Sequence, residues 1–102
     1  MKKVINRKMY DTYTANELFE WESGHSYNAH WHAETLYRKK NGEFFLVCDG
    51  GALSPYGEHL TDGSRIAGKF IRPLSDEEAL DWVAKRMDGE DVEALFPGVI
   101  QE

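Results

Sequence analysis

One short stretch, residues 34–48, constrains the fold of this chain more than any other. It reads Glu-Thr-Leu-Tyr-Arg-Lys-Lys-Asn-Gly-Glu-Phe-Phe-Leu-Val-Cys, and its two arms are rich in residues that suit a pleated sheet. The dipeptide Asn41-Gly42 lies between the arms and is a preferred centre for a type I′ turn, because both central residues of that turn need a positive φ. The pattern predicts a β-hairpin closed at this dipeptide, with Tyr37 opposite Leu46.

The segment before the hairpin is expected to hold a short strand and a short helix. Residues 3–10 form the strand candidate. Thr14 and Glu17 then match a capping box, in which the hydroxyl accepts from a backbone N–H and the carboxylate reaches back to the cap. This box predicts a helix over residues 15–22 with one apolar face.

A second capping box, Ser75 with Glu78, gives the clearest helix start in the chain. It precedes apolar residues at helical spacing, and the expected helix ends near Asp88-Gly89. A shorter helix is expected over residues 91–96, stopped by a Pro-Gly pair.

The remaining segment, residues 50–68, holds five of the nine glycines and is expected to be a long irregular connection. Residues 69–72 form one more strand candidate. Residues 1–102 are therefore expected to form a single α+β domain. It would contain a three- to four-stranded antiparallel sheet with a central β-hairpin, a short N-terminal helix, and one or two C-terminal helices packed on the sheet.

Composition limits the function classes. The formal net charge is −6, which opposes direct binding to nucleic acid because that affinity comes from neutralising phosphates. Cys48 is the only cysteine, so no internal disulfide can form, as is typical of a reducing compartment. No apolar run approaches the roughly 18 residues of a membrane span. We expect a cytoplasmic protein without a membrane partner.

Four histidines are candidates for a metal site. His25, His30 and His32 lie within eight residues, and His59 lies in the glycine-rich connection. His30 and His32 would point the same way from an extended segment and could reach one metal ion. Their spacing matches no standard zinc signature, so the plainer interpretation is a set of polar loop residues. The leading interpretation therefore includes no metal and no cofactor.

Two further features suggest chemistry but have plainer interpretations. The hairpin has a basic tip near aromatic residues, formed by Arg38, Lys39 and Lys40. Sheets that bind single-stranded nucleic acid combine these residue types. Such a tip also protects an exposed sheet edge, and we favour that interpretation. Cys48 lies beside Asp49 and lacks an activating base, so we expect it to be a small core residue rather than a nucleophile.

The acidity of the chain is concentrated in its last quarter. Residues 1–75 carry a net charge of +1, whereas residues 76–102 carry −7. Carboxylates spaced along two short helices can match phosphates and occupy a basic nucleic-acid groove on a partner protein. The plainer interpretation is an ordinary solvated acidic surface. The acids beyond those expected at the helix cap, and hence the candidate partner-binding residues, are Asp81, Asp88, Glu90, Asp91 and Glu93.

Four segments, residues 9–12, 34–46, 50–54 and 73–82, resemble in the same order a family of small orphan proteins carried by bacterial phages, plasmids and integrative elements. The resemblance spans nearly the whole chain. The sequence departs from the family pattern around residues 25–32 and at Cys48, so no shared catalytic site is expected there.

The resemblance implies an inhibitor of host defence, because small acidic proteins of such elements are often inhibitors. Anti-CRISPR proteins are among them, and several look like nucleic-acid mimics. The expectation is a non-enzymatic protein whose acidic surface blocks a basic nucleic-acid-binding site on a host protein such as a CRISPR effector subunit. Two alternatives stay open: a histidine-based metal-binding protein or small enzyme, and an oligomeric accessory protein that pairs through an exposed hairpin edge.

Overall fold

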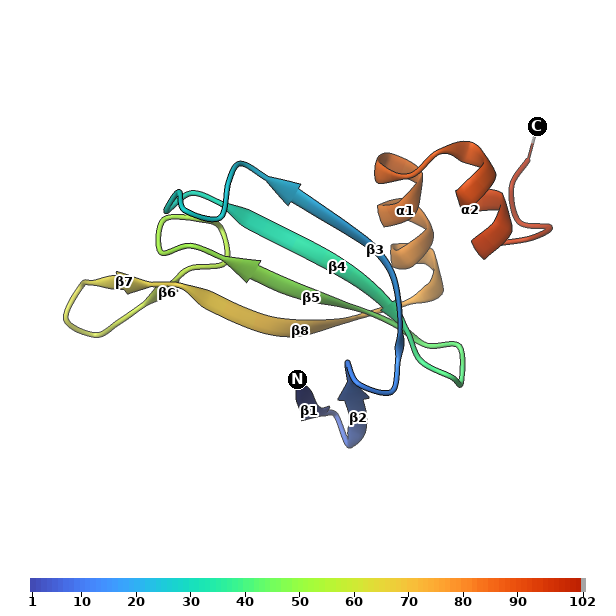
Figure 1. Cartoon of the computed structure of the whole chain (residues 1–102). Coiled ribbons are helices and arrows are strands. Elements are labelled where there is room, and N and C mark those ends of the chain that lie inside the picture. The colour runs from blue at the N-terminus through green and yellow to red at the C-terminus, as the bar shows by residue number, and fades with distance from the viewer. Residues whose placement is uncertain (102) are drawn as a thin grey trace.

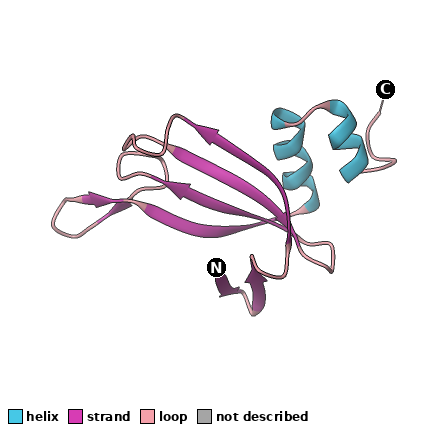
Figure 2. Ribbon diagram, viewed as in Figure 1, coloured by secondary structure: helices cyan, strands magenta, loops and turns pink. Residues whose placement is uncertain are grey.

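The structure, a computed structural model, describes residues 1–101 and has the α+β architecture expected from the sequence. The main sheet is antiparallel with the strand order β3-β4-β5-β8, and both helices lie at one end of it (Figure 1; Figure 2). Two small two-stranded sheets, β1-β2 and β6-β7, complete the fold. The elements are β1 (Lys2–Ile5), β2 (Lys8–Asp11), β3 (Asn16–Ser23), β4 (His32–Arg38), β5 (Phe44–Gly50), β6 (Glu58–His59), β7 (Arg65–Ile66), β8 (Gly68–Leu74), α1 (Asp76–Arg86) and α2 (Gly89–Leu95).

Strand β5 is central because its run of apolar residues leaves neither face suited to water. Phe44 and Leu46 point to the helices, where they join the larger core cluster. Phe45 and Val47 point to the opposite face and pack in a second cluster with Tyr10 of β2. Side chains alternate along a strand, so this one segment supplies the core on both faces of the sheet.

The expected hairpin is present as β4 and β5, but its register differs from the expectation by one residue. Tyr37 lies opposite Phe45, not Leu46. Both hairpin strands have neighbours on each side, so the expectation of an exposed hairpin edge was also wrong. The edges of the main sheet are β3 and β8.

The register differs because the turn is longer than the expected two residues. The N–H of Lys39 donates to the carbonyl of Glu43 at 2.8 Å. The loop is therefore closed by the pair Lys39 and Glu43, with three residues between them. Gly42 has a φ of 94°, whereas Asn41 stays outside the positive-φ region. The Asn41 side chain instead accepts from the N–H of Glu43 at 3.0 Å. This is the geometry of a longer hairpin loop with glycine in the left-handed position.

The expected helix over residues 15–22 was wrong, because this segment forms strand β3. It pairs with β4, and Trp21 lies opposite Glu34. Phe19 and Trp21 are two residues apart and pack against the larger core cluster, as the period of a strand allows. Glu17 caps no helix and accepts from the hydroxyl of Tyr37 at 3.3 Å. The open edge of β4 offers a complete ladder of backbone hydrogen bonds, which outweighs a local capping signal.

The expected single strand over residues 3–10 is a second hairpin. Its turn residues Asn6 and Arg7 have φ values of 50° and 66°. Two consecutive positive φ values are typical of a type I′ turn, so this turn occurs here rather than in the central hairpin. The β1–β2 hairpin lies against the sheet face opposite the helices, where the Tyr10 ring meets Phe45 at 5.5 Å between centroids.

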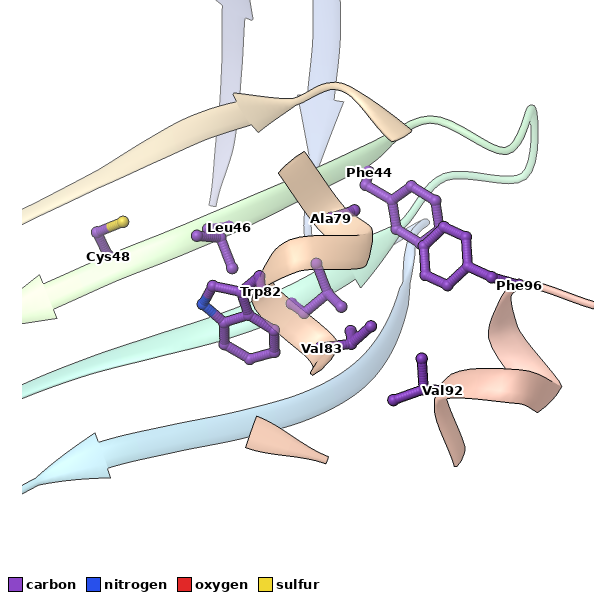
Figure 3. Packing of buried hydrophobic residues seen from close by; sticks show 9 residues of the cluster. Phe44, Leu46, Cys48, Ala79, Trp82, Val83, Val92 and Phe96 are labelled. Carbon is purple, nitrogen blue, oxygen red and sulfur yellow. The ribbon is translucent and has the colours of Figure 1, made fainter. Parts of the chain in front are cut away.

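The C-terminal helices agree with the expectation. The Ser75 hydroxyl accepts from the N–H of Glu78 at 3.1 Å, and the Glu78 carboxylate accepts from the N–H of Ser75 at 2.9 Å, which completes the capping box. Helix α1 buries Ala79, Trp82 and Val83 against the sheet (Figure 3). The ring of Phe96, just after α2, stacks on Phe44 with 5.4 Å between centroids.

Two glycines, at the end of β5 and at the start of β8, allow neighbouring groups to approach the backbone closely. A Cβ at Gly50 would overlap the side chain of Ser54, and a Cβ at Gly68 would overlap the carbonyl oxygen of Tyr56. Neither residue has a positive φ, so space rather than conformational freedom fixes their identity.

We expect Gly68→Ala to lower the free energy of unfolding by about 1–3 kcal/mol, because the new methyl group must displace backbone at Tyr56. Gly89→Ala is the matched control: a Cβ there meets nothing within 4 Å, and alanine favours a helix. Urea denaturation of both variants measures the difference. Equal stability of the two variants would show that the Gly68 contact does not constrain the fold.

Candidate functional site

A buried charge network joins α1 to the main sheet. The side chain of Glu34 on β4 is 8% exposed and accepts three hydrogen bonds. The Trp82 indole N–H donates at 2.8 Å and the Arg86 guanidinium at 3.1 Å, both to Oε1. The Tyr56 hydroxyl donates to Oε2. Residues from β4, the connection after β5 and α1 therefore meet at one carboxylate.

Arg86 completes this network from between two aromatic rings. Its guanidinium carbon lies 4.9 Å from the ring centroid of Trp21 and 4.7 Å from that of Trp82. An arginine over an indole face is a favourable cation–π contact, and partial burial strengthens it. The positive charge of Arg86 is thereby turned toward the sheet and away from the outer surface of α1.

The network keeps Glu34 ionised. Burial alone would raise the pKa of Glu34, but the hydrogen bonds from Tyr56 and Trp82 and the charges of Arg86 and Arg72 outweigh it. The pKa of Glu34 therefore lies below its ordinary value. Burial and the bond to Glu34 also raise the pKa of Tyr56. A carboxylate with a low pKa and three donors is a poor general base, so we interpret this network as structural.

Sequence reasoning missed this network. The available signal was the position of Glu34, two residues before Leu36 and so on the same inward face of the strand. A carboxylate on a core-facing position requires donors from another element. Its donors Trp82 and Arg86 are about fifty residues away in sequence, and no local pattern connects them.

Four of the five candidate acids lie together at the start of α2, and all five are exposed. Asp88 is the N-cap residue of α2, where its side chain makes no capping hydrogen bond. Glu90, Asp91 and Glu93 follow within the helix. Asp81 lies apart from them on α1.

Asp81 has basic neighbours. It lines a cavity of about 300 Å³ between α1 and β8, together with Arg72 and Lys85. Glu34, Glu78 and Arg86 line the same cavity, so Asp81 lies among charges of both signs.

The helical layer presents more acidic charge than its sequence suggests. Residues 76–95 contain eight carboxylates, all exposed, and none of them takes part in an ion pair within residues 1–101. The segment has two bases, of which Arg86 is paired inward with Glu34. Lys85 is the remaining base on this segment of the surface.

The histidines lie in separate settings. His25 stacks on Tyr27 with 5.4 Å between ring centroids. His32 packs edge-on against Trp21 and Tyr56, and His59 lies on β6. Within residues 1–101, no three His, Cys, Asp or Glu side chains are close enough together to hold a metal ion. Cys48 is buried, and burial raises the pKa of its thiol.

The basic tip of the central hairpin is largely occupied by local contacts. The guanidinium of Arg38 lies over the Phe44 ring at 4.9 Å, and the ammonium of Lys39 lies over the Tyr10 ring at 3.7 Å. Lys39 also pairs with Glu43 at 3.2 Å. These contacts fix the tip against the β1–β2 hairpin.

Comparison with protein-family models, with curated proteins and with solved structures gives no match for this chain. Within residues 1–101, no helix combines the length and the apolar character needed to cross a bilayer.

We expect Glu34→Gln to lower the free energy of unfolding by about 2–3 kcal/mol, because it leaves Arg86 without its counter-charge. The amide oxygen can still accept from Trp82, which keeps the loss below that of a full deletion. The matched control is Glu43→Gln, which breaks ion pairs that are more exposed. The control should change stability little.

The same variant should alter the response to acid. The pKa of Glu34 is lower in the folded protein than its ordinary value of 4.5. Its contribution is therefore complete above pH 4.5 and is lost as the pH falls through the folded pKa. Urea midpoints measured from pH 7 to pH 3 should fall more steeply for the native chain than for Glu34→Gln. Parallel curves would show that Glu34 does not contribute to acid sensitivity.

Proposed function

We propose that this chain is a non-enzymatic binding protein that blocks a basic nucleic-acid-binding surface on a host defence protein. The observation that carries the proposal is the exposed acidic layer of α1 and α2, in which eight carboxylates face water beside one outward base. A basic groove that normally binds the phosphates of nucleic acid would find similar negative charge on such a surface.

The acids of α2 are the centre of the proposed contact. Asp88, Glu90, Asp91 and Glu93 lie within six consecutive residues and have no ion-pair partner in residues 1–101. No charge within the protein has to be released before they bind a partner's lysines or arginines. Anchoring of α1 by Glu34 and Arg86 would hold this layer in place, which lowers the entropy lost on binding.

The resemblance to proteins of phages and other mobile elements directs the choice of partner. We take a CRISPR effector subunit as the first candidate, because it holds guide or target nucleic acid in a basic channel. The protein would then act in the cytoplasm of the host cell as an anti-CRISPR protein and would need neither a metal nor a cofactor.

Charge removal on α2 tests the proposal. The variant Asp88→Asn/Glu90→Gln/Asp91→Asn/Glu93→Gln should weaken binding to the effector at least tenfold, because it removes four negative charges from the contact. Affinity of the native chain should also fall as salt is raised, since rim charges are screened. Surface plasmon resonance on immobilised effector and a plasmid-interference assay in cells measure the two effects.

The matched control removes acids at the far end of the molecule. Glu58→Gln/Asp62→Asn lies at the β6–β7 hairpin, away from the helices (Figure 1). It should bind and inhibit as the native chain does. Circular dichroism confirms that each variant is folded. Full inhibition by the α2 variant would refute the acidic-surface mechanism, and failure of the native chain to bind any effector would refute the choice of partner.

A further inference from the structure

The sheet face opposite the helices is covered at one end only. The β1–β2 hairpin packs there through Tyr10 on Phe45. Beyond the hairpin, this face forms a groove of about 290 Å³. The groove runs across all four strands of the main sheet, since its lining includes Glu20 of β3, Tyr37 of β4, Asp49 of β5 and Lys69 of β8. Trp31, from the loop before β4, also lines it.

The groove is acidic and has aromatic walls. Its three carboxylates, on Glu17, Glu20 and Asp49, face one base. Tyr37 is held by stacking on Phe45 at 5.1 Å and by its bond to Glu17. Fixed aromatic faces beside carboxylates favour the aliphatic stems and charged heads of lysine and arginine.

The covered end of the same face has the opposite character. The β1–β2 hairpin, residues 2–11, carries four bases and one acid, Asp11. Arg7 is exposed at the turn and makes no ion pair or side-chain hydrogen bond within residues 1–101. Lys2 lies on the outer face of the hairpin, and its side chain is 62% exposed with Asp11 at 3.7 Å. Arg7 has a φ of 66° at a turn position where glycine is favoured, so a long cationic side chain is present despite its conformational cost.

The outer surface of the β1–β2 hairpin is also apolar. Val4 and Met9 lie opposite each other in register and are 64% and 49% exposed. Their neighbours Ile5 and Tyr10 pack onto the chain's own sheet. Because side chains alternate across a strand, Val4 and Met9 point away from it.

We propose that this face binds a second copy of the chain, with the β1–β2 hairpin of each copy lying in the acidic groove of the other. One face thus carries both a basic, apolar projection and an acidic, aromatic groove. A two-fold axis between two copies brings each basic hairpin to the acidic groove of the other copy. Such an isologous interface closes as a dimer. Each hairpin would lie between two sheets, with Tyr10 against its own sheet and Val4 and Met9 against the partner's. The contact is independent of the acidic layer on α1 and α2.

Reciprocal charge reversal tests the proposal. The variant Lys2→Glu/Arg7→Glu has an acidic hairpin and an acidic groove, so it should be monomeric. The variant Glu17→Lys/Glu20→Lys has a basic hairpin and a basic groove, and it should be monomeric too. Mixed in equal amounts, the two variants should form a heterodimer, because each hairpin then meets a groove of opposite charge.

Sedimentation equilibrium at hundreds of micromolar measures the outcome. The native chain should have twice the mass of the 11.7 kDa monomer, and the mixture should recover that mass. The control Glu90→Lys/Glu93→Lys alters only the helical layer and should remain dimeric. It also separates this proposal from the proposed function, because the control loses effector binding and not the dimer.

Three outcomes would overturn the proposal. These are a native chain that stays monomeric, a mixture that does not associate although both variants are folded by circular dichroism, and a native dimer that neither charge reversal affects. A monomeric native chain that binds a nona-arginine peptide, with the binding lost in Glu17→Lys/Glu20→Lys, would assign the groove to a basic segment of another protein instead.

Discussion

Strand β5 must be buried on both faces, and the rest of the structure follows from that requirement. Phe44, Leu46 and Cys48 need a cover on one face, while Phe45 and Val47 need one on the other. One face of an antiparallel sheet can remain exposed to water, but a strand that is apolar on both faces needs both of them covered. Helix α1 covers the first face and the β1–β2 hairpin covers part of the second. Burial of each Phe, Leu or Val side chain contributes about 1.5–3 kcal/mol, so losing either cover would cost much of the stability.

The Glu34 network links this packing to the charge of the surface. A carboxylate on the inward face of β4 is costly unless donors reach it, and α1 provides two of them through Trp82 and Arg86. The same contact removes a positive charge from the outer surface of α1. Acidity in the helical layer is thus partly a consequence of how the helix is anchored. The network and the proposed binding surface should therefore be considered together, although Glu34 itself lies inside.

Two capping boxes of similar quality show how far local sequence could predict the fold. Ser75 and Glu78 precede residues at helical spacing, and the helix forms with both hydrogen bonds of the box. Thr14 and Glu17 precede Phe19 and Trp21, whose two-residue spacing also suits a strand. A capping box stabilises a helix by about 1 kcal/mol, so it decides between helix and strand only where no sheet edge is available for pairing. The free edge of β4 was available here, and it could not be recognised before the sheet itself was known.

The turns show the same limit. Asn41-Gly42 has the composition of a type I′ turn, yet Asn6-Arg7 has its geometry. In the central hairpin, Lys39 and Glu43 bond to each other and to the β1–β2 hairpin through Tyr10 and Lys8, so tertiary contacts favour the longer loop. The apolar run of β5 and the acidic C-terminal quarter could both be predicted from the sequence, because each depends on adjacent residues. The buried role of Glu34 could not be predicted in this way, because its donors Trp82 and Arg86 are about fifty residues away in the sequence.

Both acidic surfaces of this molecule lie against rigid elements, but their settings differ physically. The carboxylates of α2 face open water, where a Debye length of about 8 Å limits each charge to close partners. Those of the groove lie beside Trp31 and Tyr37 on a sheet floor, where lower local polarity strengthens each interaction. The first setting favours fast, salt-sensitive association with a large basic surface. The second favours a few cationic side chains held in defined positions. The main sheet lies between the two surfaces, so partners at the two proposed contacts would not compete for the same side of the chain.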